Sequence, residues 1–204
     1  MFERAHHQRI ARVLQALDGK LLREAHCLFA GGTAIALRFG EYRESVDIDF
    51  LVSDIASYRH LRQLLTGPMG FAGLLRSGAE VFAQTRELRA DQYGIRTSLL
   101  VSEQPIKFEI VLEGRIKLAA PTAVDEICGI SSLTPLDMAT SKLLANSDRW
   151  ADDSVFSRDL IDLAMMRPSL ALLRKAITKA EEAYGNSIRR DLGQAIGLLQ
   201  SRHS

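Results

Sequence analysis

A glycine pair and an aspartate pair constrain the fold of this chain more than any other feature. An apolar run ends at Gly31 and Gly32 and continues as an amphipathic segment, a pattern that predicts a strand turning into a helix. Asp47 and Asp49 interrupt the next apolar run, residues 46–52. Because side chains alternate along a strand, both carboxylates should point to one face while their apolar neighbours point into a core.

The two pairs together have the chemistry of a nucleotide site. Adjacent carboxylates repel each other unless a cation lies between them, and Mg²⁺ usually binds one or two protein carboxylates plus substrate phosphates. Backbone N–H groups at a helix N-terminus favour phosphate, and Gly31 and Gly32 would let it approach closely. Taken singly, either pair is more often a turn or a solvated strand end. Their combination predicts a nucleoside triphosphate with Mg²⁺.

Composition sets the class of protein. The chain has 204 residues, 47% hydrophobic and 25% charged, which suits one large or two small globular domains. A net charge of +1 provides no strong overall field for nucleic acid, so any such contact needs a local basic patch. Cys27 and Cys128 lie in apolar surroundings and are expected to be reduced core residues. The sequence shows neither a signal peptide nor a membrane span, and we expect a cytoplasmic protein.

The hydrophobic pattern divides the chain into an α/β half, residues 1–114, and a helical half, residues 115–204. Pro105 is expected at the turn of a hairpin over residues 93–112, and residues 71–84 are ambiguous. Thr134 and Pro135 have the chemistry of a helix start. The other expected strands are residues 26–30 and 46–52, and the other expected helices are residues 3–25, 33–40, 55–65, 155–166, 170–184 and 187–201.

A third carboxylate is expected from the strand at residues 106–112. Glu109 alternates with apolar neighbours there, so it should face away from the core, together with Lys107. An isolated strand glutamate is usually a solvated residue. A site with two metal ions, however, needs more ligands than Asp47 and Asp49 supply, and Glu109 is the best-placed candidate.

The helical half carries polar residues at helical spacing. Lys142, Asn146 and Arg149 recur on one helix face, which is either a polar outer surface or a lysine directed at triphosphate oxygens. In the following helix, charges at positions i and i+4 suggest pairing within the helix itself. The residues concerned are Arg158, Asp159 and Asp162.

The order of these motifs resembles the AbiEii/AbiGii nucleotidyltransferase toxins, bacterial relatives of the DNA polymerase β-type nucleotidyltransferases. The resemblance covers roughly residues 25–164. The residues that carry it are Gly31-Gly32-Thr33-Ala34-x-Ala36-Leu37, Arg43-x-Ser45-x-Asp47-Ile48-Asp49-Phe50, Lys142-Leu143-x-Ala145-x-x-x-Arg149 and Arg158-Asp159-x-x-Asp162-Leu163.

The resemblance implies an α+β fold, with a nucleotidyltransferase core of mixed β-sheet flanked by helices and a C-terminal helical domain. It implies that Asp47 and Asp49 hold Mg²⁺, that Lys142 contacts phosphate, and that Asp162, with Asp159, assists from the helical domain. It also implies a role in a toxin–antitoxin or phage-defence system. A cognate antitoxin and a transfer RNA acceptor are then expected partners.

Three functions fit these observations. The first is an enzyme that transfers a nucleoside monophosphate from NTP to a hydroxyl of RNA or protein. In this enzyme Asp47, Asp49 and Glu109 would hold two Mg²⁺, and Gly31, Gly32 and Thr33 would bind the triphosphate.

The second function is a non-catalytic nucleotide-binding or interaction module, and the third is an antibiotic-type enzyme acting on small molecules. A deep acidic pocket would favour the small-molecule enzyme, and an open cleft with basic walls a macromolecular acceptor. The candidates for such a wall are Arg38, Arg43, Arg59 and Arg62.

Overall fold

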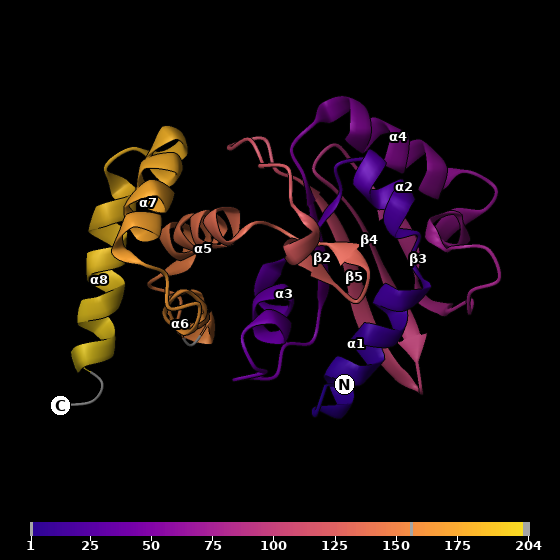
Figure 1. The fold of residues 1–204 in the computed structure, drawn as a ribbon, viewed down its shortest axis with the longest axis horizontal. Helices are drawn as coiled ribbons and strands as arrows, with labels where there is room; N and C mark the ends of the chain where they lie inside the picture. Colours follow the sequence, from indigo (N-terminus) through magenta and orange to yellow (C-terminus); the bar gives the residue numbers. More distant parts are fainter. Residues whose placement is uncertain (1, 156, 202–204) are drawn as a thin grey trace. The chain divides into compact units, whose positions relative to one another are not determined.

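The chain folds into two compact units, Met1–Leu133 and Thr134–Ser204. The structure is a computed structural model that describes residues 2–155 and 157–201 (Figure 1). The first unit extends beyond the boundary expected after residue 114, because the chain returns to the sheet. Strands β6 (Glu126–Ile127) and β7 (Ile130–Ser131) form a small hairpin, and Ser132 bridges to Phe29.

The first unit contains a five-stranded mixed sheet. Its strand order is β1-β2-β5-β4-β3, in which β2 and β5 are parallel and the other neighbours antiparallel. The sheet confirms the expected α+β class. Its strands are β1 (Leu28–Ala30), β2 (Ile48–Val52), β3 (Ala83–Ala90), β4 (Gly94–Val101) and β5 (Gln104–Leu112).

Helices before and between these strands complete the first unit. The helix expected over residues 3–25 is two helices, because the Asp18 carboxylate accepts hydrogen bonds from the Lys20 and Leu21 N–H groups and starts a new helix. The four helices are α1 (Ala5–Ala16), α2 (Gly19–Glu24), α3 (Gly31–Arg38) and α4 (Ile55–Thr66), and two short 3₁₀ turns follow at Gly70–Leu74 and Ala123–Asp125.

Helix α3 ends at a glycine, as its sequence predicts. Gly40 has a φ of +88°, and the Glu41 N–H donates to the Ala36 carbonyl at 2.7 Å. This is the bond of a Schellman motif, which glycine favours because it has no Cβ.

The β4–β5 hairpin confirms one expectation and corrects another. The hairpin forms, but Pro105 lies in β5 opposite Leu100 and not at the turn. The turn is made by Ser102 and Glu103, whose φ angles of 49° and 63° suit the twist of a tight hairpin.

Strand β3 was not expected from the sequence. It is an edge strand, and its side chains are mostly exposed on both faces. A strand of this kind lacks the alternation of apolar and polar residues that reveals a half-buried strand.

Aromatic side chains fill the core on one face of the sheet. Ring centroids lie 5.6 Å apart for Phe29 and Phe50, 5.5 Å for Phe50 and Phe108, and 5.0 Å for Phe108 and Phe71. Full burial of each such ring stabilises the fold by roughly 1.5–3 kcal/mol. The residues that alternate with these phenylalanines therefore face the other side of the sheet.

The second unit is helical, as expected. Helix α5 begins at Pro135 after Thr134, whose hydroxyl accepts a hydrogen bond from the Asp137 N–H at 3.3 Å. Within the described residues, no helix is both long and apolar enough to cross a membrane. The helices are α5 (Pro135–Arg149), α6 (Arg158–Met165), α7 (Leu170–Tyr184) and α8 (Ser187–Ser201), with a 3₁₀ turn at Asp153–Val155.

Candidate functional site

A row of charged residues crosses the sheet of the first unit. Asp49 on β2 is the register partner of Glu109 on β5, Glu109 pairs with Arg96 on β4, and Arg96 pairs with Arg89 on β3. Register partners share a face, which here is the face opposite the aromatic core. Asp49 is half-buried while its strand neighbours are buried, which confirms the predicted alternation.

Gly31 lies against the Asp49 carboxylate. A Cβ at Gly31 would come within 2.5 Å of Asp49 Oδ2, and the φ of Gly31 is +73°. Both the space and the backbone conformation therefore require glycine. The contact brings the first turn of α3 beside the carboxylate, which the sequence analysis expected from the glycine pair.

A hydrogen-bonded network anchors the segment that carries Asp47. The buried Thr33 hydroxyl donates to the Asp47 carbonyl at 2.5 Å and lies 2.8 Å from the Ser45 hydroxyl. The Ser45 N–H donates to His7 Nε2 at 3.1 Å, and His7 Nδ1 lies 2.7 Å from Glu41. Since Nε2 accepts, Nδ1 carries the proton and donates to the carboxylate. The Thr33 hydroxyl is thus already engaged, and its expected contact with triphosphate would use its backbone N–H.

Glu109 faces away from the core but is not a solvated residue. Lys107 Nζ and Arg96 Nε each lie 2.5 Å from one of its carboxylate oxygens. Burial alone would raise the pKa of Glu109, but the hydrogen bonds and charges of Lys107 and Arg96 hold that pKa below its ordinary value.

The Lys107 ammonium interacts electrostatically with the carboxylates of Glu109, Asp49 and Asp47. Burial alone would lower the pKa of Lys107, but Glu109, followed by Asp49 and Asp47, holds that pKa above its ordinary value. Lys107 therefore supplies positive charge where the sequence analysis placed metal ions. From the sequence, Lys107 was expected only to share the face of Glu109.

The acids fit a magnesium site in part. Asp47 and Asp49 present hard oxygen ligands of the kind that Mg²⁺ shares with substrate phosphates. Glu109 is engaged with Lys107 and Arg96, and would have to exchange these cations for a metal. Across residues 2–155 and 157–201, no group of three or more His, Cys, Asp or Glu side chains is arranged to hold a metal ion. Metal binding by the three acids stays a prediction.

The structure of the second unit brings Lys142 and Asp162 together. Lys142 Nζ lies 2.7 Å from Asp162 Oδ2 and 2.9 Å from Asp159 Oδ1, and Arg149 donates two hydrogen bonds to Asp159 at 2.7 and 2.9 Å. Lys142 is only 7% exposed and Asn146 5%, so a polar outer surface is wrong for these two positions. Contact of Lys142 with phosphate stays a prediction.

The charges of α6 pair mainly with α5. Burial alone would raise the pKa of Asp159, but Arg149 and Lys142 hold that pKa below its ordinary value. Arg158 donates to the Val155 carbonyl at 3.0 Å, and Asp162 bonds to Lys142. The aspartates of α6 therefore pair with residues of α5, and not within α6 as the sequence suggested.

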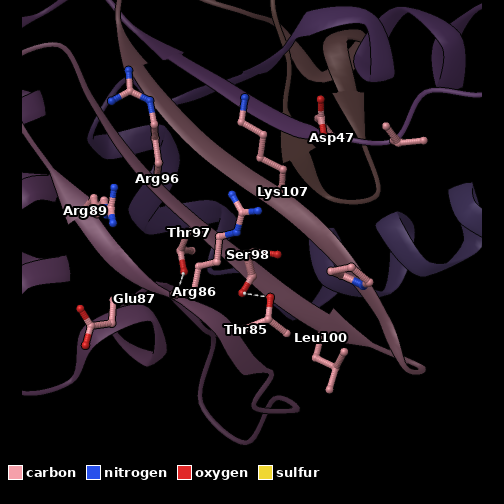
Figure 2. Close-up of a pocket in the computed structure, with 12 residues that line it drawn as sticks. Asp47, Thr85, Arg86, Glu87, Arg89, Arg96, Thr97, Ser98, Leu100 and Lys107 are labelled. Atoms are coloured by element: carbon pink, nitrogen blue, oxygen red, sulfur yellow. Dashed lines mark hydrogen bonds between the residues drawn. The ribbon is translucent and has the colours of Figure 1, made fainter.

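A groove of about 960 Å³ lies beside Asp47 on the charged face (Figure 2). Basic residues from three neighbouring strands line it: Arg86 and Arg89 on β3, Arg96 on β4, and Lys107 on β5. These four cations form the wall that the sequence analysis assigned to other arginines, such as Arg38, which instead bonds to Asp125 at 3.0 Å. The sequence did not indicate Arg86 and Arg89, because strand β3 lacks a clear alternation of apolar and polar residues.

Both cysteines are free, as expected, although only Cys27 is fully buried and Cys128 is half-buried. Burial raises the pKa of the Cys27 thiol far above its ordinary value. Cys27 is therefore an inert core residue.

Residues 12–201 match a family described as the nucleotidyl transferase AbiEii toxin of a type IV toxin–antitoxin system. This match spans most of the chain, and the protein belongs to the AbiEii nucleotidyltransferase toxin family. The motifs that carried the resemblance to this family lie on the charged face of the sheet and in the helical unit. Among curated proteins, no sequence matches the chain.

Two solved structures resemble the fold at low identity. JHP933 from Helicobacter pylori is 16% identical, with 100% of both chains covered and a TM-score of 0.40. An antigenic nucleotidyltransferase-like protein from Paracoccidioides brasiliensis is 15% identical, with 96% of this chain and 94% of that chain covered and a TM-score of 0.48.

Proposed function

We propose that this protein transfers a nucleoside monophosphate from NTP to a hydroxyl group of RNA or protein. The contact of Gly31 with Asp49 carries the proposal, because it joins a helix N-terminus suited to phosphate with a carboxylate suited to metal. Membership of the AbiEii family supports nucleotidyl transfer as the reaction class.

The first turn of α3 would bind the triphosphate. The N-cap residue Ala30 supplies no capping side chain, which suits the N–H groups of Gly31, Gly32 and Thr33 to phosphate oxygens. Mg²⁺ held by Asp47 and Asp49 would neutralise phosphate charge and lower the pKa of the acceptor hydroxyl. The hydroxyl oxygen would bond to the α-phosphorus as the bond to pyrophosphate breaks, with the hydroxyl proton passing to solvent or a carboxylate.

Lys142 would contact phosphate, as the family motif implies. Asp159 and Asp162 hold its ammonium in one place, and an ammonium has one more N–H donor than these two contacts use, so it could bond to a phosphate oxygen at little cost in side-chain order. Asp162 would then act by positioning Lys142. This role rests on the two contacts to Lys142 and on the family motif.

The basic groove supports a macromolecular acceptor over a small antibiotic-like one, since its walls carry more cations than acids. A non-catalytic nucleotide-binding module is the second candidate. The engagement of Glu109 by Lys107 and Arg96 favours that candidate, because it withholds the third carboxylate. The family also supports a cognate antitoxin as a partner that suppresses the activity.

The test is a transfer assay with each α-labelled NTP, total cellular RNA and total protein, with Mg²⁺ or with EDTA. We expect label in one macromolecular fraction, dependent on Mg²⁺ and absent with Asp49→Asn. If calorimetry detects NTP binding but no NTP gives transfer, the proposed enzyme activity is refuted and the non-catalytic module is supported. Growth arrest on expression, relieved by a neighbouring gene, would support the toxin role.

A further inference from the structure

Asp47 lies just outside the pairing of the sheet. The pairing of β2 with β5 begins at Ile48, and its pairing with β1 begins at Asp49, so Asp49 has a strand neighbour on each side. Asp47 precedes the strand and ends an irregular segment, residues 41–47. The position of the Asp47 carboxylate beside Asp49 therefore depends on the contacts that hold this segment.

Two adjacent histidines of α1 bond to the backbone of the segment. His6 Nε2 lies 3.0 Å from the Val46 carbonyl oxygen, and because a carbonyl only accepts, this nitrogen donates. The neighbouring side chain works in the opposite sense, since Nε2 of the fully buried His7 accepts from the Ser45 N–H at 3.1 Å. One contact thus needs a proton on Nε2, and the other needs its absence.

The carboxylate of Glu41 determines which nitrogen of His7 carries the proton. It accepts hydrogen bonds from the Glu3 and Arg4 N–H groups at 2.7 and 3.2 Å, and it lies 2.7 Å from His7 Nδ1. Burial alone would raise the pKa of Glu41, but the hydrogen bonds that it accepts hold that pKa below its ordinary value. An ionised carboxylate only accepts, so the His7 proton lies on Nδ1 and Nε2 can accept from Ser45.

Glu41 also has a backbone conformation that glutamate rarely adopts. Its φ is 51°, in the left-handed region, where a residue with a Cβ is strained unless its surroundings hold it. Arg4 Nε donates to the Glu41 carbonyl at 2.9 Å, in addition to the contacts with the carboxylate. Contacts with α1 therefore stabilise this conformation, which directs the carboxylate at His7.

We propose that His7 is a positioning residue for Asp47, because its neutral ring ties the segment before β2 to α1 and so places the Asp47 carboxylate beside Asp49. The tie is made at Ser45, two residues before Asp47. Thr33 holds the same segment from α3, through the Asp47 carbonyl at 2.5 Å. The inference rests on the proposed function for the use of Asp47, and it adds a residue outside the motifs of the resemblance.

The first test identifies the protonated nitrogen of His7. Protein labelled with ¹⁵N-histidine is studied in EDTA at about pH 8, above the ordinary pKa of histidine, by long-range ¹H–¹⁵N correlation NMR. The His7 ring is assigned by its absence from the spectrum of His7→Gln. We expect a proton on Nδ1 alone. A proton on Nε2 would prevent the bond from Ser45 and would overturn the proposal.

Two substitutions then separate the roles of the two ring nitrogens. Glutamine at position 7 can place its amide oxygen near the site of Nε2 and accept from Ser45. Asparagine is shorter and reaches only the site of Nδ1, beside Glu41. The variants are therefore His7→Gln and His7→Asn, with His60→Asn on an exposed position of α4 as the control.

The ¹³Cα chemical shifts of Val46 and Asp47 report the backbone of the segment without metal or NTP. They should change in His7→Asn and stay close to the wild-type values in His7→Gln and in the control. Unchanged shifts in His7→Asn, or equal changes in both His7 variants, would overturn the proposal. If His7→Asn does not fold, His7→Gln decides, because its shifts must then match those of the wild type.

Metal affinity separates this inference from the proposed function. Mn²⁺ binding without NTP, measured by electron paramagnetic resonance, should weaken about tenfold in His7→Asn and recover in His7→Gln, since losing a residue that orients a metal ligand typically costs about 10- to 100-fold in affinity. Wild-type Mn²⁺ affinity in a folded His7→Asn would overturn the inference alone. If the wild type binds no Mn²⁺, the proposed metal role of Asp47 fails, and the chemical shifts still decide the role of His7.

Discussion

Asp49 and Glu109 lie directly opposite each other on the parallel strands β2 and β5. Two carboxylates in this position repel, yet Lys107 and Arg96 bond to Glu109 at 2.5 Å and offset its charge. Glu109 therefore needs no metal ion to offset its charge. A metal ion bridging Asp49 and Glu109 would have to compete with Lys107, so these two acids are not equivalent ligands.

Asp49→Asn should abolish nucleotidyl transfer and leave the fold intact. Asparagine keeps the shape that packs against Gly31 but removes the charge that a metal ion requires. Its loss removes repulsion with Asp47 and attraction to Lys107 together, so the melting temperature without metal should change little. Circular dichroism and the transfer assay measure the two effects. Transfer at the wild-type rate would rule out the proposed role of Asp49.

Gly31→Ala should destabilise the first unit and displace Asp49. The new Cβ would lie 2.5 Å from Asp49 Oδ2 at a residue whose φ is +73°. Gly40→Ala is the matched control, because Gly40 has a φ of +88° but open space around its Cβ position. Backbone strain should cost each variant about 1 kcal/mol in urea unfolding, and the clash should add to this only at Gly31. Equal losses of stability in the two variants would mean that Asp49 moves away from the new Cβ without a cost in free energy.

Glu109→Gln should make stability less dependent on acid pH. The folded state holds the pKa of Glu109 below its ordinary value, so its pairing stabilises the fold above the unfolded pKa of about 4.3. That contribution disappears as pH falls through the lower, folded pKa. The free energy of unfolding of wild type and variant should thus differ at neutral pH and converge in acid.

Urea titrations from about pH 7 down to about pH 3 cover the range through and below the unfolded pKa of glutamate. Glu103→Gln, in the exposed β4–β5 turn, is the control for removing one negative charge from the same hairpin. A difference between wild type and Glu109→Gln that stays constant with pH would show that Glu109 stabilises the sheet by packing alone.

Lys142→Ala should destabilise the helical unit strongly. It removes the Lys142 ammonium from the buried carboxylates of Asp159 and Asp162, a change that typically costs about 3–5 kcal/mol. Lys175→Ala removes an exposed lysine from α7 and should change little. Denaturant unfolding compares them.

A second variant separates the contribution of Lys142 to folding stability from its expected contact with phosphate. Lys142→Met/Asp162→Asn removes the Asp162 charge along with the lysine, and Arg149 still pairs with Asp159. It should regain part of the stability but not the NTP affinity. Wild-type NTP affinity in this folded double variant would refute the triphosphate contact.

The sequence alone determined features that depend on near neighbours in the chain. The outward position of Asp49 follows from alternation along one strand, and the ends of α3 and α5 follow from Gly40, Thr134 and Pro135. A strand period or a helix cap involves residues only a few positions apart. The family motifs are equally local.

Only the tertiary structure decided which charges meet. The parallel register of β2 and β5 places Glu109 beside Asp49, sixty residues away along the chain, and gives it Lys107 and Arg96 as partners. Packing of α6 on α5 buries Lys142 between two aspartates, where helical spacing alone suggested an outer face. Whether a charge is solvated or paired depends on which distant segments pack against it, and a local pattern carries no information about that choice.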